Sequence, residues 1–196
     1  MKKTILSNLV LYVSLFLSSC SSSTSTTGNI TAKFSFELDG VRYQNTINLP
    51  ASNPTVIQGA CGYVTSDQGM VSLAMSMPKT TDPSIVITIP SNPRQGSFTI
   101  TPSSFTNNAS YAAITWIPTP TNMQSYNSHI GNSNNSNFTV NISSYGPRSA
   151  FNNPNFATNP TNIGLVKGTF SGTLYNPQSG QKVTITNGSF EAINMK

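Results

Sequence analysis

The stretch ITAKFSFELDGVRYQNTINL, residues 30–49, decides the fold class. Its first nine residues alternate between apolar and polar side chains. The apolar positions are Ile30, Ala32, Phe34, Phe36 and Leu38. A period of two residues is that of a β-strand with one buried face. The following pair Asp39-Gly40 favours a two-residue type I′ turn, and the alternation resumes in residues 41–49. The stretch therefore predicts a β-hairpin.

The same period recurs along the rest of the chain, and no window shows the apolar stripe of an amphipathic helix. Charged residues make up only 8% of the sequence, so Asn, Ser and Thr supply most of the polar surface. These residues favour turns and strand surfaces over helix interiors. Further strands are expected in residues 55–65, 71–77, 85–89, 98–100, 111–117, 138–142, 166–175, 181–186 and 189–193. We therefore expect an all-β fold, a single antiparallel β-sandwich or flattened barrel of about ten strands.

The carboxy-terminal section contains glycines inside its strongest strand pattern. Gly168 and Gly172 alternate with Val166, Phe170 and Leu174 at the apolar positions. A glycine in a strand interior indicates close approach of a large side chain or of another strand. The segment NPQSG predicts a turn, and Asn187-Gly188 predicts a bulge or bend in the returning strand.

Two segments, residues 118–137 and 145–162, are long, polar and rich in Pro and Asn. Loops longer than about 12–15 residues are uncommon unless they serve a function or are disordered. We therefore expect two long loops on the sandwich.

The first 19 residues have the order of an export signal. Lys2 and Lys3 precede an apolar run over residues 9–17, and the small residues Ser18 and Ser19 follow. A membrane-spanning helix needs about 20 apolar residues, so a transmembrane anchor is the weaker interpretation.

The tetrapeptide Leu17-Ser18-Ser19-Cys20 resembles the lipobox of bacterial lipoproteins. The resemblance implies that residues 1–19 are a signal peptide, and that the Cys20 thiol carries a diacylglycerol at the mature amino terminus. An ordinary secretory peptide with an incidental cysteine is the alternative. Residues 20–29 would then be the lipidated cysteine and a flexible Ser/Thr tether, and residues 30–196 a single β-sandwich domain.

Two segments, FSFELDGVRYQNTI (residues 34–47) and GTFSGTLYNPQSGQKVTITNGSFEAI (residues 168–193), resemble small uncharacterised lipoproteins of Bacteroidetes. The resemblance implies this fold and lipid anchoring to the bacterial outer membrane, and it assigns no catalytic residue. Surface-exposed lipoproteins of this kind often carry acidic residues after the cysteine. The segment SSSTSTT has none, so the periplasmic and cell-surface faces both remain open.

The charge pattern does not predict a nucleic-acid partner. The chain has ten Lys and Arg and five Asp and Glu, a net charge of +5, and removal of Lys2 and Lys3 would lower it to +3. The remaining basic residues are scattered through the sequence, whereas a nucleic-acid surface concentrates them in a stripe.

Few residues in the chain could act in catalysis or bind a metal, so we expect a protein that is not an enzyme. Asp39, Asp67 and Asp82 lie in expected turns, whereas Glu37 and Glu191 lie on expected strand faces and could meet across a sheet. His129 is the only histidine, so four metal ligands are hard to assemble, and we expect no metal and no cofactor.

A hydrolase is the distant alternative. It would need His129 as its base, yet no Gly-x-Ser-x-Gly motif accompanies this histidine. Cys61 is the one cysteine besides Cys20, and we expect a buried apolar thiol at this position rather than a nucleophile.

Two functions remain open. One is a lipid-anchored envelope protein that acts as a non-enzymatic binding or structural module. The other is a glycan- or peptide-binding accessory lipoprotein that uses loops 118–137 and 145–162. The candidate ligand-binding residues are Trp116, Tyr126, His129 and Tyr145, with Phe151 and Phe156 nearby. Aromatic rings beside amides and hydroxyls suit a sugar or peptide, and the alternative is that these rings only pack their own loops or the core.

Overall fold

The computed structural model describes residues 30–49, 60–65, 71–89, 95–100, 111–119, 122–128, 137–146 and 164–195. These residues form eleven strands and no helix. The strands are β1 (Ile30–Leu38), β2 (Val41–Leu49), β3 (Ala60–Thr65), β4 (Val71–Ser76), β5 (Ser84–Ile89), β6 (Gly96–Ile100), β7 (Tyr111–Thr119), β8 (Asn122–Asn127), β9 (Phe138–Tyr145), β10 (Leu165–Tyr175) and β11 (Lys182–Met195). The expected signal peptide, Cys20, the tether and His129 lie outside the described residues.

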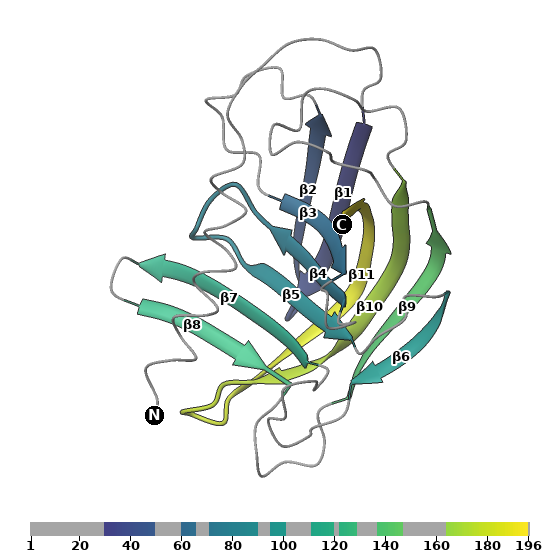
Figure 1. Ribbon diagram of the computed structural model, residues 1–196. Coiled ribbons are helices and arrows are strands. Elements are labelled where there is room, and N and C mark those ends of the chain that lie inside the picture. Colours follow the sequence, from purple (N-terminus) through teal and green to yellow (C-terminus); the bar gives the residue numbers. More distant parts are fainter. Residues whose placement is uncertain are drawn as a thin grey trace.

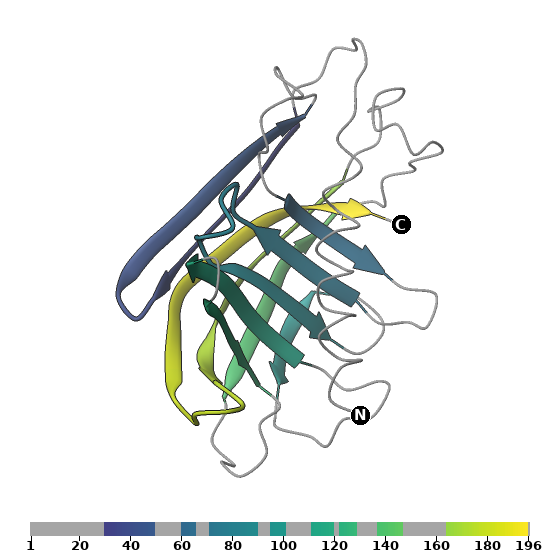
Figure 2. The same ribbon diagram turned by 90° about the vertical axis from the view of Figure 1, so that its left-hand side faces the viewer.

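The strands form two layers that cross obliquely (Figure 1). The first layer has the order β2-β1-β11-β10-β9-β6, and the second has the order β3-β4-β5-β7-β8. Figure 2 shows the long β1–β2 hairpin along one side of the first layer. The all-β prediction of a sandwich or flattened barrel is confirmed.

The two layers join at two corners, so the sheet closes into a ring. At one corner β3 pairs with the end of β11, with Gly62 opposite Ile193. At the other corner β8 meets β10 where Asn127 lies opposite Tyr175. The β3–β11 pairing is parallel, which makes the sheet mixed. The sequence pattern did not indicate this pairing, because alternation within a strand carries no information about the direction of its partner.

The hairpin of residues 30–49 forms as predicted. Asp39 and Gly40 have φ angles of 48° and 84°, as a type I′ turn requires at both central positions. The Asp39 N–H donates to the Thr184 carbonyl at 2.9 Å, and the Asp39 carboxylate accepts from the Thr184 N–H at 2.7 Å. The turn is therefore fastened to β11.

Two Gly-x-Phe triplets face each other across β10 and β11. Gly168 lies opposite Phe190, and Phe170 lies opposite Gly188. A Cβ on Gly168 would lie 2.6 Å from Phe190 Cζ, and a Cβ on Gly188 would lie 2.6 Å from Phe170 Cδ2. Each ring therefore occupies the space above the opposite glycine, which confirms the expected close approach.

The predicted bulge lies at Asn187-Gly188. On β1, Ser35 pairs with Ser189 while Glu37 pairs with Thr186, so Phe36 faces two residues of β11. Asn187 has a φ of 52°, the left-handed conformation that asparagine tolerates better than most residues. The extra residue increases the local bend of the strand.

The core lies between the two layers. The first layer contributes Ala32, Phe34, Phe36, Leu38, Ile47, Ile100, Phe138, Val140, Ile142, Val166, Phe170, Leu174, Val183, Ile185, Phe190 and Ala192. The second layer contributes Cys61, Leu73, Met75, Ile85, Ile87, Ile89, Ala112, Ile114 and Tyr126. Because the opposite positions of the first-layer strands are polar, that layer has a buried face and an outer face directed away from the core.

Part of the first long loop is a strand. Residues 118–137 were expected to be loop, but β7 continues to Thr119 and residues 122–127 form β8, which pairs with β7. Only Tyr126 is buried in β8, so the strand lacks the apolar alternation that would have indicated it. Pro118 falls where the β7–β8 register shifts, between Trp116 and Thr119, and a strand tolerates proline at such an irregularity.

Hydrogen bonds from the buried residue Asn194 hold both ends of the second long segment. Tyr145 is the last residue of β9, and residues 147–163 lie outside the described part of the chain. Asn194 is buried; its N–H donates to the Gly164 carbonyl at 2.9 Å and its Nδ2 donates to the Gly146 carbonyl at 2.8 Å. Asn194 on β11 thus holds the two residues that flank the segment, Gly164 through its backbone and Gly146 through its side chain.

Candidate functional site

Trp116 and Tyr126 pack against each other on the second layer. Their rings stack with centroids 5.5 Å apart and planes 9° apart. Tyr126 is 6% exposed within the core, and its hydroxyl donates to Gln124 Oε1 at 3.4 Å. Trp116 is partly buried against the same core. The structure therefore brings these two candidates together as packing residues.

Tyr145 lies on the first layer, opposite Val166, and also packs against the core. The first long segment ends where β9 begins, at Phe138, and the second starts where β9 ends, at Tyr145. Seven residue steps along a strand span about 23 Å. The structure therefore separates the end of the first segment from the start of the second by the length of β9, and His129 lies outside the described residues.

Glu37 and Glu191 share the outer face of the first layer but do not form a carboxylate pair. Glu191 lies opposite Lys33, and Glu37 lies four positions further along β1. Glu37 accepts hydrogen bonds from Asn187 Nδ2 at 2.9 Å and from Thr186 Oγ1 at 3.3 Å. Each carboxylate thus has its own partners, about 13 Å of strand apart.

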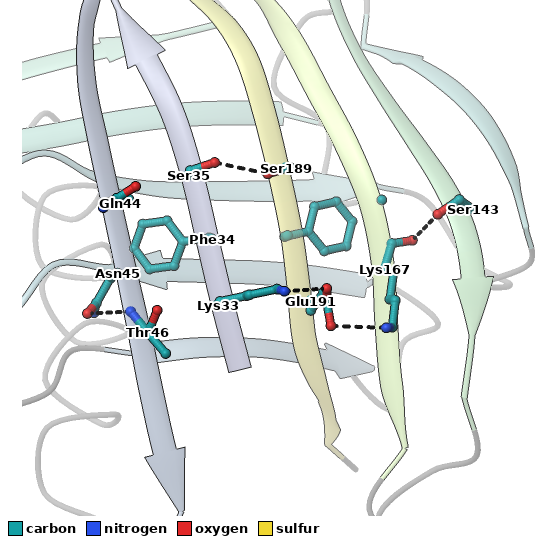
Figure 3. Close-up of a pocket in the computed structure, with 12 residues that line it drawn as sticks. Lys33, Phe34, Ser35, Gln44, Asn45, Thr46, Ser143, Lys167, Ser189 and Glu191 are labelled. Carbon is teal, nitrogen blue, oxygen red and sulfur yellow. Dashed lines mark hydrogen bonds and ion pairs between the residues drawn. The ribbon is translucent and has the colours of Figure 1, made fainter. Parts of the chain in front are cut away.

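The outer face of the first layer carries a polar hollow of about 340 Å³ that extends from β2 to β9 (Figure 3). We call it the outer-face hollow. Its polar side chains come from five adjacent strands, and they are Gln44, Thr46, Lys33, Ser35, Ser189, Glu191, Lys167 and Ser143. Asn45 also borders the hollow, but its side chain turns inward and donates to the Ser76 carbonyl at 3.3 Å. Pockets that bind small molecules typically measure 300–1,000 Å³, so the hollow is at the small end of this range.

The hollow exists because two small residues lie side by side among longer ones. Ser35 on β1 lies opposite Ser189 on β11, and their hydroxyl oxygens are 3.0 Å apart. Two residues along β1, Lys33 lies opposite Glu191 and forms a taller row beside the serines. Because cross-strand neighbours project from the same face, the short serine row becomes a floor and the charged row becomes a wall.

The wall is a ladder of three charges across three strands. Lys33 Nζ lies 2.9 Å from Glu191 Oε1, and Lys167 Nζ lies 3.0 Å from Glu191 Oε2. Figure 3 shows both lysines extended toward the carboxylate from either side. The hydrogen bonds from Lys33 and then Lys167 hold the pKa of Glu191 below its ordinary value. The ladder carries one net positive charge when the carboxylate is ionised.

Replacing Glu191 with Gln is expected to make stability less dependent on pH. Because the pKa of Glu191 is lowered in the folded state, its contribution is present above the unfolded pKa and is lost as the pH falls through the folded pKa. Two partly exposed ion pairs contribute about 1–2 kcal/mol together at neutral pH. Urea unfolding should give that deficit for Glu191→Gln at neutral pH and no deficit below the lowered pKa. A deficit that stays constant over this range would contradict the assigned role.

Cys61 lies beneath the ladder, with its Sγ 3.6 Å from the carbonyl oxygens of Lys33 and Glu191. It is 5% exposed and forms no disulfide, as expected of a buried apolar thiol. Burial, and secondarily the charge of Glu191, raises the pKa of the Cys61 thiol far above its ordinary value. The thiol therefore stays protonated and is a poor nucleophile.

Within the described ranges, no group of three or more His, Cys, Asp or Glu side chains is placed to hold a metal ion. The described part of the chain also contains no helix that is long and apolar enough to cross a membrane.

Sequence reasoning weighed Glu191 as one of a carboxylate pair and treated the lysines as scattered charges. The outer-face hollow was missed because its residues come from segments up to 158 positions apart, from Lys33 to Glu191. One local signal was available: Lys33, Lys167 and Glu191 each occupy a polar position in a segment where polar and apolar residues alternate.

No protein-family model, curated protein sequence or solved structure matches the chain.

Proposed function

We propose that this chain is a lipid-anchored protein of the bacterial outer membrane whose β-sandwich is a non-enzymatic binding module. Lipid anchoring is supported by the order of three segments along the chain. Leu17-Ser18-Ser19-Cys20 comes first, a Ser/Thr-rich tether follows, and the first strand begins at Ile30. Acyl chains on the mature amino terminus contribute about 0.8 kcal/mol per buried methylene, and two or more chains anchor stably.

The anchor keeps the start of the first strand close to the membrane. Residues 21–29 of the tether span roughly 15–18 Å r.m.s. as a flexible coil, so Ile30 stays near the bilayer. Ile30 pairs with Leu49 at one end of the first layer, whereas the Asp39-Gly40 turn lies at the other end. The turn therefore lies at the end of the hairpin that is remote from the anchored residue Ile30, and the outer-face hollow lies between these two ends.

Binding is supported by the outer-face hollow. Hydroxyls, amides and charged groups line one depression, which suits a polar ligand with several hydrogen-bonding groups. A glycan- or peptide-binding accessory lipoprotein is the second candidate function, and the hollow supports it better than the two long segments do. The first of those segments ends at one end of β9 and the second starts at the other end, and Trp116 and Tyr126 pack against the core.

Replacing Cys20 with Ser tests the anchor. The wild-type protein should remain with the membrane pellet after a carbonate wash, whereas Cys20→Ser should be unprocessed or released, because no thioether can form. Cys61→Ser is the matched control and should stay in the pellet, because its thiol is buried in the folded domain and the change leaves Cys20 available for lipidation. Equal retention of a processed Cys20→Ser protein would refute lipid anchoring. Protease treatment of intact cells then distinguishes the cell-surface face from the periplasmic face.

A further inference from the structure

We propose that the outer-face hollow binds an acidic saccharide, a chain of sugar residues that carry carboxylates. The proposal deepens the proposed binding function by naming the chemical class of ligand. It rests on the sign of the charge on this face, on the arrangement of the two lysines and on the hydroxyl floor.

Most of the described cations lie on one face. Five Lys and Arg residues lie in the described part of the chain, and four of them project from the outer face of the first layer. These four are Lys33, Arg42, Lys167 and Lys182, and the fifth, Lys79, follows β4 in the second layer. The same face carries Glu37 and Glu191, with Asp39 in the turn at its end. The four cations against three carboxylates leave this face with one net positive charge, the sign that complements an anionic partner.

The two lysines are arranged for a ligand that crosses the strands. Lys33 and Lys167 approach Glu191 from opposite sides, so one carboxylate holds both side chains along the wall of the hollow. Their side chains are 54% and 46% exposed, so a ligand can reach both ammonium groups. An ammonium has three N–H donors, so each lysine can bind Glu191 and a ligand carboxylate together.

The hydroxyl floor favours a saccharide over a membrane surface. Ser35 and Ser189 lie below the charged row, and Gln44 borders the same hollow. Sugar hydroxyls donate and accept hydrogen bonds, as the serine hydroxyls and the Gln44 amide do. A flat anionic bilayer could meet the lysines but could not enter the hollow to reach the serines. A ligand that binds both the lysines and the serine floor needs carboxylates and hydroxyls on the same molecule, as an acidic saccharide has.

Calorimetric titration with short oligomers of galacturonate and of glucuronate tests the proposal on the unlipidated chain from residue 21. At least one acidic oligomer should bind, and its fully methyl-esterified form should bind at least about tenfold more weakly. A hydrogen bond to a charged group contributes about 1.5–3 kcal/mol, so Lys33→Ala and Lys167→Ala should each weaken binding about tenfold or more. Lys79→Ala removes the same charge away from the hollow and should leave affinity unchanged.

Ser189→Leu fills the floor without changing charge and should also abolish binding. Circular dichroism melting of each variant verifies that it is folded. Failure of every acidic oligomer to bind would overturn the proposal, as would equal binding of the ester or an equal loss with Lys79→Ala. Binding to phosphatidylglycerol vesicles with no saccharide binding would also overturn it and assign the face to the membrane. If a different ligand binds the wild-type protein and the Lys33→Ala variant equally well, the acidic-saccharide inference is overturned, whereas the proposed binding function stands. The membrane-retention result for Cys20→Ser does not depend on either outcome.

Discussion

Replacing Gly168 with valine is expected to lower the free energy of unfolding by about 3 kcal/mol or more, the upper part of the range for overpacked cores. The added Cβ would lie 2.6 Å from Phe190 Cζ and would also collide with the Asn141 carbonyl oxygen of β9. The second obstacle is backbone, so a change of rotamer cannot remove it. The loss would be a large part of the 5–15 kcal/mol that stabilises an ordinary domain.

Thr169→Val is the matched control for this substitution. It places the same side chain on the next residue of β10, where the position is exposed on the outer face. Surface substitutions of this kind change stability by at most about 0.5 kcal/mol. Urea unfolding of both variants measures the difference. Equal stability of Gly168→Val and wild type would show that β9, β10 and β11 are not packed as described.

Replacing Phe170 with alanine is expected to cost about 3–5 kcal/mol, because a large buried ring is lost and a cavity remains. Phe170 is 3% exposed and connects three other rings of the first layer. Its ring centroid lies 6.1 Å from that of Phe36 and 6.3 Å from those of Phe138 and Phe190. Four strands, β1, β9, β10 and β11, therefore meet at this side chain.

Phe98→Ala is the corresponding control, because Phe98 lies on the edge strand β6 and is only partly buried. Its loss should cost clearly less than that of Phe170 when both are measured by urea unfolding. The denaturant dependence of the unfolding free energy should stay near the wild-type value in both variants if the domain still unfolds as one unit. A smaller effect for Phe170 than for Phe98 would place the centre of the core elsewhere.

These two predictions concern the framework that positions the outer-face hollow. Gly168 and Phe190 are part of the hollow's backbone floor, and the neighbouring residues Lys167 and Glu191 form its charged wall. The close contact of each ring with the opposite glycine fixes the register of β10 against β11. The register in turn places Lys167 opposite Glu191, so the packing of the buried face determines the charge pattern of the exposed face.

The candidate site could be predicted only in part. The polar positions of residues 30–38 and of the carboxy-terminal strands indicated an exposed face, and Glu191 was recognised as lying on it. The lysines were not assigned to that face as a group, because their strand partners are far apart in sequence. Trp116 and Tyr126 could not be assigned from sequence alone, because an aromatic ring in a polar segment is compatible with a loop site and with core packing; the structure places both against the core.

The sequence by itself determined the strands with a clear period of two residues, the turn at Asp39-Gly40, the close approach at Gly168 and the bulge at Asn187-Gly188. Each of these depends on local geometry, either the alternation of side chains or the conformational freedom of a few turn residues. Only the tertiary structure decided that β3 runs parallel to β11, that residues 122–127 form a strand and that Lys33, Glu191 and Lys167 form a ladder. These features depend on which distant segments become neighbours, and that choice follows from closing the two layers around one core rather than from any single stretch of the chain.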